Sequence, residues 1–219
     1  LNSARVIVVD HHINPSFGDI QVIDSNAAST TQVLFREILS AKIAIDKNIA
    51  NCLMTGLITD TGRFQYSNTD NEVFEIASKL MLSGAELTSI SDNIYGSITL
   101  NAIKLQSEVL NRIELYEDEE LVVSYVLQED YQNYNIDSSE TDFLIDSIRL
   151  VKESNIALLL KEQQDKSFKG SLRSRNELDV QQIASLFGGG GHKAASGFST
   201  NLSMEEIKNK VKNAINSQI

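Results

Sequence analysis

The stretch VIVVDHH, residues 6–12, runs four apolar residues directly into an acid and two histidines. An unbroken β-branched run is typical of a strand that is covered on both faces of a parallel sheet. Asp10, His11 and His12 would then lie at the carboxyl end of that strand, which is the edge where open α/β sheets bind ligands. The stretch therefore predicts an α/β fold with titratable side chains at one sheet edge.

The next segments continue an alternation of strands and helices. Residues 21–24 form a second predicted strand, and Ser29 with Gln32 has the spacing of a capping box before a helix. A further capping box is expected at Thr69 and Glu72, ahead of a helix with a regular apolar stripe. The first half of the chain is thus predicted to be a parallel-sheet domain.

A helix is also predicted over residues 48–60. Its apolar stripe is formed by Ile49, Cys52, Leu53, Gly56 and Leu57. Continuing the helical period places Asp60 on the same buried face, and Gly62 would end the helix in a left-handed conformation. Cys52, the only cysteine, is expected to be a buried thiol.

The pattern changes near residue 100, so we expect domains over residues 1–100 and 101–219, the second beginning with a linker helix. The second domain is predicted to be a smaller α/β domain with a mixed sheet. Its acidic residues 117–120 form a predicted turn. Its expected strands lie at residues 121–127, 156–160 and 170–175, and its expected helices at 141–150, 180–187 and 203–215.

Composition limits the possible partners. The chain has 219 residues, 42% of them hydrophobic, and a net charge of -11, which disfavours binding to duplex nucleic acid. No apolar run approaches the roughly 18 residues of a membrane span, so we expect a cytoplasmic protein with no membrane partner. Because the chain begins with Leu1 and a strand follows almost at once, we expect it to be a piece of a longer protein.

Asp60 and His11 are candidate metal ligands. A buried carboxylate in the last turn of a helix faces the negative end of the helix dipole and also loses hydration. A cation would relieve both costs, and imidazole with carboxylate suits manganese, iron, cobalt or zinc. The alternative is that Asp60 only accepts hydrogen bonds in a turn and that the histidines are core residues.

A second candidate site is FGGGGHKAASG, residues 187–197. Glycines let a backbone approach a ligand closely, and a helix beginning near His192 would offer free amides to an anion. Arg173 and Arg175 share one face of a predicted strand and could grip phosphate. The alternative is a flexible linker. Arg63 and Tyr66 are further candidates for substrate contacts, with ordinary surface roles as the alternative.

The stretches VIVVDHH, GLITDTGRFQYSNT, SLRSR and FGGGGHKAASGF, in this order, resemble the DHH phosphoesterase family. The resemblance is to its branch of bifunctional oligoribonucleases that also dephosphorylate pAp, and it covers the whole chain. It implies a DHH catalytic domain, a DHH-associated substrate-binding domain, and a two-metal site, usually manganese, that activates water for phosphate ester hydrolysis.

The resemblance also implies residue roles. His11 and Asp60 correspond to metal ligands, His12 to a phosphate contact and Asp10 to an acid that supports or joins the site. The substrate grip corresponds to Arg173, Ser174, Gly190, Gly191 and His192. The implied partners are short single-stranded RNA oligonucleotides and pAp, and the family allows a homodimer.

One departure affects activity. The family's earlier acidic motifs precede DHH, and only nine residues precede Asp10 here. We therefore expect this chain alone to bind metal weakly and turn over poorly. The alternatives are a cyclic-dinucleotide phosphodiesterase or a single-strand exonuclease of the same family, or a non-catalytic nucleotide-binding module.

Overall fold

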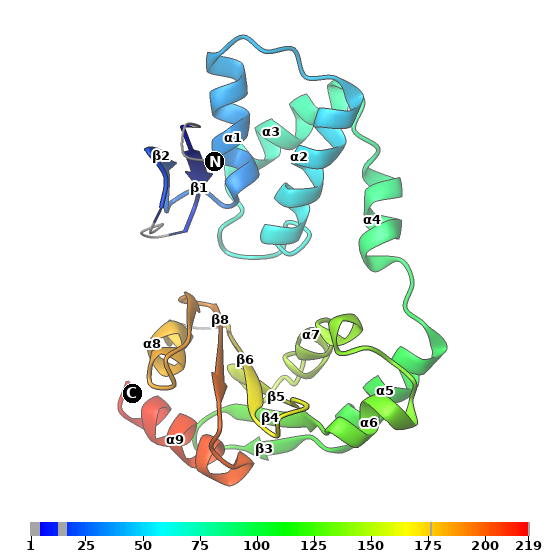
Figure 1. Ribbon diagram of the computed structural model, residues 1–219, viewed down its shortest axis with the longest axis vertical. Helices are drawn as coiled ribbons and strands as arrows, with labels where there is room; N and C mark the ends of the chain where they lie inside the picture. Colours follow the sequence, from blue (N-terminus) through cyan, green and yellow to red (C-terminus); the bar gives the residue numbers. More distant parts are fainter. Residues whose placement is uncertain (1–4, 13–16, 176, 219) are drawn as a thin grey trace. The chain divides into compact units, whose positions relative to one another are not determined.

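The computed structural model describes residues 5–12, 17–175 and 177–218. The chain divides into two compact units, Leu1–Ser97 and Ile98–Ile219 (Figure 1). Each unit contains both helices and a sheet, so the predicted α/β class is confirmed. The second unit is the longer one in this chain, whereas we expected the smaller domain there.

Unit 1 is built around helices. Its elements are β1 (Ile7–Asp10), β2 (Ile20–Ile23), α1 (Thr30–Ser40), α2 (Lys47–Asp60), α3 (Asn71–Leu82) and α4 (Leu87–Tyr95). One apolar core joins the four helices, with Phe35, Leu57, Val73 and Ile90 among its buried residues. The sequence analysis did not predict α4.

Strands β1 and β2 are parallel, with Val9 opposite Val22 and Asp10 opposite Ile23. The two strands therefore end at the same edge, and Asp10 is the last residue of β1. Val6 and Ile7 are 45% and 61% exposed, so the predicted burial of this stretch on both faces is wrong for the described residues. In the part of the chain that the structure describes, this sheet has only two strands.

The buried face of α2 differs from the prediction by one residue. Its buried residues are Ala50, Leu53, Met54, Leu57 and Ile58. The next position on that face is Thr61, which is fully buried, whereas the Asp60 side chain is 40% exposed. Cys52 is exposed as well. Two apolar stripes were available one residue apart, and the one with Met54 and Ile58 buries the larger area.

Helix starts follow local hydrogen-bonding rules. Ser29 caps α1 by accepting from the Gln32 backbone, as predicted. The cap of α3 is Asp70 rather than the predicted Thr69, since Asp70 accepts from the Val73 backbone. The Glu72 carboxylate is instead held by two side chains, Arg36 and Gln32, which accounts for the failed capping box.

Unit 2 has a six-stranded mixed sheet in the order β3-β4-β5-β6-β8-β7. Its strands are β3 (Glu114–Tyr116), β4 (Leu121–Val126), β5 (Ile156–Glu162), β6 (Phe168–Ser174), β7 (Gly190–His192) and β8 (Ala195–Thr200). Its helices are α5 (Leu100–Asn111), α6 (Gln128–Asn133), α7 (Leu144–Ile148), α8 (Val180–Ser185) and α9 (Met204–Asn216), with a 3-10 turn at Ser138–Thr141.

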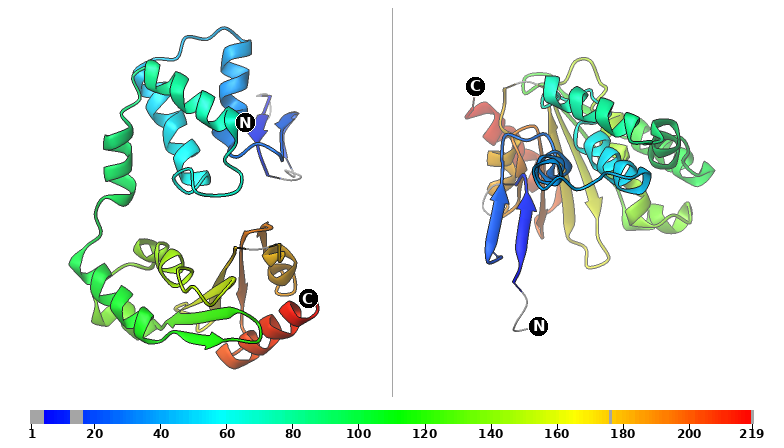
Figure 2. Two further views of the ribbon diagram at one scale, coloured as in Figure 1. Left: turned by 180° about the vertical axis from the view of Figure 1, so that it is seen from behind. Right: turned by 90° about the horizontal axis from the view of Figure 1, so that it is seen from above.

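The two faces of this sheet are covered unequally (Figure 2). On one face, α8 and α9 pack with residues of β4, β5, β6 and β8, including Leu158, Leu172 and Phe198. On the other face, α5, α6 and α7 pack mainly on β4 and β5, through residues such as Val122 and Leu159, and α7 also contacts β6. The β6, β8 and β7 part of this second face contributes no residue to the described cores.

Among the described residues, none of the helices is both long and apolar enough to span a bilayer. The cytoplasmic location stays a prediction.

Candidate active site

Asp10 collects four donors on one carboxylate oxygen. Its Oδ1 accepts from the backbone N–H groups of His11 at 2.7 Å and His12 at 3.2 Å. It also accepts from the His12 ring Nδ1 at 2.8 Å and the Thr30 hydroxyl at 2.9 Å. The His12 side chain is the main reason that the pKa of Asp10 lies well below its usual range. Asp10 is therefore a charged group that organises the strand end.

His11 is 8% exposed, and its Nδ1 lies 3.2 Å from the Ala27 carbonyl oxygen. A carbonyl only accepts hydrogen bonds, so Nδ1 carries the hydrogen. In the neutral ring, Nε2 is then the nitrogen with the lone pair. Metal-binding histidines typically have this arrangement, since a hydrogen bond at one ring nitrogen fixes the tautomer at the other.

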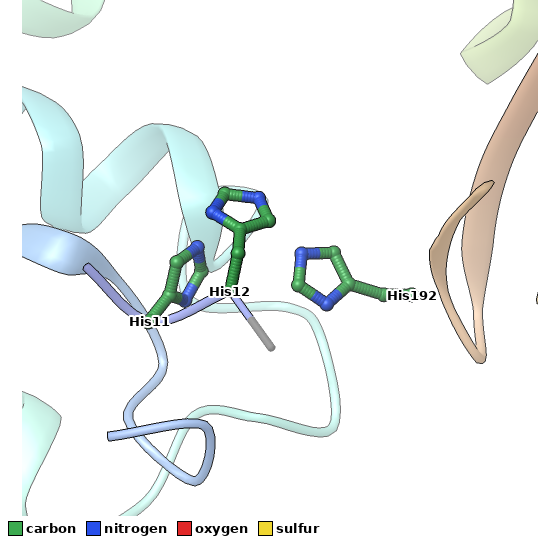
Figure 3. A group of neighbouring side chains, drawn as sticks. All are labelled: His11, His12 and His192. Carbon is green, nitrogen blue, oxygen red and sulfur yellow. The ribbon is translucent and has the colours of Figure 1, made fainter. Parts of the chain in front are cut away.

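His12 is arranged in the same way but is exposed. Its Nδ1 donates to Asp10, and its ring meets the His11 ring edge to face with centroids 4.5 Å apart (Figure 3). The Nε2 atom of His12 can donate to a phosphate oxygen when it is protonated. The geometry thus suits the phosphate contact that the resemblance implies, and that role stays a prediction.

The His11 Nε2 and Asp60 Oδ2 atoms are 3.8 Å apart. Two ligands of one first-row metal ion, each about 2.0 to 2.2 Å from the ion, lie roughly 3 to 4 Å from one another. Asp60 ends α2, where the helix dipole adds negative potential that favours a cation. The donor set, the separation and the potential all fit a divalent cation, although the burial expected of Asp60 is wrong.

A left-handed turn follows Asp60 directly. Gly62, Arg63 and Phe64 have φ angles of 55°, 62° and 64°, so the predicted left-handed end at Gly62 is confirmed and extends over two further residues. For the two residues other than glycine, this conformation costs about 1 to 3 kcal/mol each, which surrounding contacts must offset. Here the Thr61 hydroxyl accepts from the Phe64 backbone, and the Arg63 guanidinium lies 4.5 Å over the Tyr95 ring. Arg63 is thus directed to α4.

Thr30 and Asn68 also hold this site, and no sequence pattern indicated either residue. The Asn68 side-chain N–H groups donate to the carbonyls of Ala28 at 3.2 Å and Asp60 at 3.1 Å. Asn68 therefore joins the loop that anchors His11 to the end of α2. Only contacts between residues far apart in sequence reveal either role, because neither residue stands in a spacing that predicts one.

In unit 2, strand register brings Arg173 and His192 to one face of the sheet. Both residues are opposite Ala195, Arg173 on β6 and His192 on β7. Residues in register project to the same face, with strands about 4.8 Å apart. The next row on that face contains Ser171, Gly197 and Gly190. Arg173 and His192 thus flank a floor of small residues, of which Ser171 has the largest side chain.

The glycines of this hairpin have different roles. A Cβ on Gly191 would meet the Ser196 Cα at 2.7 Å, and its φ is 141°, so the backbone requires glycine there. A Cβ on Gly190 would meet nothing within 4 Å. The helix expected to begin near His192 is absent, because residues 190–192 form strand β7. The flexible-linker alternative also fails, since β7 pairs with β8.

Ser174 does not share the face of Arg173. It is 7% exposed and follows Leu172 on the core side of β6, as strand alternation requires. The structure brings Arg173, Gly190 and His192 together on one face and leaves Ser174 and Gly191 on the other. A substrate contact of Ser174 stays a prediction.

Comparisons with known proteins place these features in a family. Residues 118–218 match the family model described as the DHHA1 domain. Over 216 residues the chain is 30% identical to the bifunctional oligoribonuclease and PAP phosphatase NrnA of Thermus thermophilus. Residues 118–218 thus match the DHHA1 domain, and the chain is similar over nearly its whole length to a protein of the DHH phosphoesterase family. The matched segment covers 98% of this chain and 64% of the Thermus protein.

Other DHH family proteins give the same result. The Bacillus subtilis protein of the same name is 23% identical over 202 residues, covering 90% of this chain and 63% of the relative. The crystal structure of an exopolyphosphatase-related protein from Bacteroides fragilis superposes with a TM-score of 0.87 at 27% identity, covering 98% of this chain and 64% of that one. The chain thus spans less than two thirds of the length of these relatives.

Proposed function

We propose that the protein is a metal-dependent phosphoesterase that hydrolyses short oligoribonucleotides and pAp, as its DHH family relatives are named to do. The observation that carries the proposal is the facing pair of His11 Nε2 and Asp60 Oδ2 at the end of β1, 3.8 Å apart. These two residues would hold a divalent cation, for which we propose Mn²⁺. When bound, the cation supplies positive charge to the phosphate and activates water.

The surrounding side chains of unit 1 keep the site in one geometry. Ala27 fixes the His11 ring through Nδ1, and Asp10 fixes the His12 ring in the same way. Because the pKa of Asp10 is depressed, its carboxylate stays charged across the physiological range and continues to hold His12. His12 is the residue we assign to the substrate phosphate.

Unit 2 supplies the second part of the proposal. Arg173 offers a planar cation that can donate two hydrogen bonds to one phosphate, and His192 offers a further ring nitrogen. The floor of Ala195, Gly197 and Gly190 allows a flat base or ribose to lie against the sheet. A face with one arginine and no broad basic surface suits a short substrate.

The test combines metal binding with turnover. Mn²⁺ binding to the 219-residue chain, which we expect to be weak, is measured by electron paramagnetic resonance, and the low phosphate release that we expect of this chain is measured with pAp. We expect Asp60→Asn to lose both. The control is Glu75→Gln, which neutralises an exposed acid on α3 that forms no ion pair with a described residue and should change neither measurement.

Substrate comparison separates the alternatives. Phosphate ester hydrolysis is measured on pAp, a diribonucleotide, bis-p-nitrophenyl phosphate and cyclic di-AMP with and without Mn²⁺. The proposal expects pAp and the diribonucleotide to be preferred. Preference for cyclic di-AMP would assign a cyclic-dinucleotide phosphodiesterase, and nucleotide binding without metal binding or turnover would assign a non-catalytic module.

A further inference from the structure

On the face of the sheet that carries Arg173 and His192, β6 and β8 contribute no residue to the described cores, and this part of the face extends well beyond Arg173 and His192. Its side chains are Arg173, Ser171 and Lys169 on β6 and Ala195, Gly197 and Ser199 on β8. We call these six residues the bare strip. None of them belongs to a described hydrophobic core, and all are half-buried or exposed. The strip is therefore a continuous surface made of small, polar and cationic side chains.

Lys169 is the cation at the far end of the strip. It lies four residues before Arg173 on the same face, which corresponds to about 13 to 14 Å along an antiparallel strand. Its side chain is exposed, and it forms no hydrogen bond or ion pair with another residue of the described ranges. Its neighbour in register, Lys161, is 3% exposed and is held by Asp142 at 2.6 Å. Lys169 has no such internal partner.

Beyond Lys169 the surface becomes acidic. Ser199, opposite Lys169 in register, also lines a polar pocket of about 860 Å³. Three carboxylates line this pocket, those of Asp137, Glu162 and Asp165. The strip thus has cations at both ends, small residues between them and carboxylates past its end. Carboxylates repel phosphate, so the strip favours a polyanion of limited length.

We propose that the bare strip is an extended subsite for a short single-stranded RNA, in which Lys169 contacts a phosphate that pAp does not reach. This inference rests on the proposed function, since it assigns Arg173 and His192 to the phosphate nearer the reacting bond. The occupant is set by charge complementarity and by a floor without large side chains. Lys169 acts on binding of longer substrates and takes no part in the reaction.

The experiment is isothermal titration of the 219-residue chain with a diribonucleotide and a tetraribonucleotide in metal-free buffer, which prevents hydrolysis. We expect Lys169→Met to weaken the tetranucleotide by about 5- to 10-fold, as loss of one charge-assisted contact does, and the dinucleotide by less than about twofold. The slope of log affinity against log salt should fall by about 0.7 for the tetranucleotide.

A matched control is Lys104→Met, which removes an exposed lysine from α5, a helix that contacts β4 and α7. This control should leave both affinities unchanged. Equal weakening by Lys169→Met and Lys104→Met would indicate only net charge and would overturn the proposal. So would a Lys169→Met chain that binds the tetranucleotide as the wild type does.

The outcomes also separate this inference from the proposed function. If the wild type binds both RNAs and Lys169→Met has no selective effect, only the strip is disproved. If the wild type binds neither RNA, the substrate-binding role of unit 2 fails together with the strip. Thermal melting of each variant checks that the fold is retained.

Discussion

The end of β1 in unit 1 and the bare strip in unit 2 achieve specificity in opposite ways. At the end of β1, each titratable side chain is fixed by hydrogen bonds, and Oδ1 of Asp10 alone accepts four. On the strip, the useful feature is that side chains are small, as at Ala195 and Gly197. If both proposals hold, the difference teaches that a metal site needs held donors, whereas a binding face for RNA needs open backbone between cations.

Removing a metal-donor side chain at the end of β1 should have the largest effect, which we expect on Mn²⁺ affinity. His11→Ala removes a proposed metal ligand, and changes outside the ligand shell alone typically cost 10- to 100-fold in metal affinity. We therefore expect Mn²⁺ affinity to fall by more than about 100-fold in a titration followed by electron paramagnetic resonance. Unchanged affinity would contradict the assignment of His11.

Two adjacent glycines of β7, Gly190 and Gly191, test the role of small residues in unit 2. Gly191→Ala should lower stability by about 2 kcal/mol, because its Cβ would collide with Ser196 and its φ is 141°. Gly190→Ala should leave the melting temperature unchanged, since its Cβ meets nothing within 4 Å, yet weaken dinucleotide binding. Thermal melting and isothermal titration check both. Equal melting temperatures for the two variants would contradict the steric argument.

A smaller change removes one donor from Asp10. Thr30→Val keeps the shape of the side chain but deletes the hydrogen bond to Asp10, which we expect to cost about 1 kcal/mol of stability. Mn²⁺ affinity should fall by about 10-fold if this bond helps to orient the site. The control is Thr55→Val, whose hydroxyl donates only to the Asn51 carbonyl within α2.

The smallest expected effect is the pH dependence of the stability that the ion pairs of Arg36 contribute to unit 1. Arg36 bonds Asp24 and Glu72, and these bonds lower the pKa of both carboxyl groups. Their contribution is present above about pH 4 and is lost as pH falls through the lowered pKa values. Because all three groups are partly exposed, it should be about 1 kcal/mol or less.

Thermal melting between about pH 7 and pH 3 tests this expectation. Arg36→Met should melt lower than the wild type at pH 7, and the gap should close as the pH falls. A gap that is constant with pH would show that Arg36 acts by packing rather than by charge.

The sequence predicted five of the eight strands of the described residues, and most helices, because apolar spacing and caps are local properties, whereas β3, β7 and β8 were not predicted. It failed at the phase of α2, where two apolar stripes compete and only packing against the other helices decides between them. The same failure explains why Asp60 was expected to be buried. Its expected proximity to His11 is nevertheless present, since the two side chains lie 3.8 Å apart.

The run of glycines indicated the candidate site in unit 2, but the backbone conformation predicted for it, a helix start near His192, was wrong. Four consecutive glycines indicate a close approach of backbone, but they do not distinguish a helix start from a hairpin. The pairing of β7 with β8 settles it, and that pairing depends on contacts with Ser196 and Ala195 that no local rule contains. Thr30 and Asn68 were missed because their contacts are with residues far away in the sequence, and Lys169 was missed because its proposed role depends on residues across a sheet.

The exposed thiol of Cys52 can be labelled chemically, which would not be possible for the buried thiol that the sequence predicted. It is the only cysteine of the chain, and it is exposed on α2, the helix that ends in Asp60. A nitroxide attached there would report from a single known position, and a paramagnetic ion captured at the end of the same helix would broaden its spectrum. The native cysteine can thus test the proposed metal binding without any engineered residue.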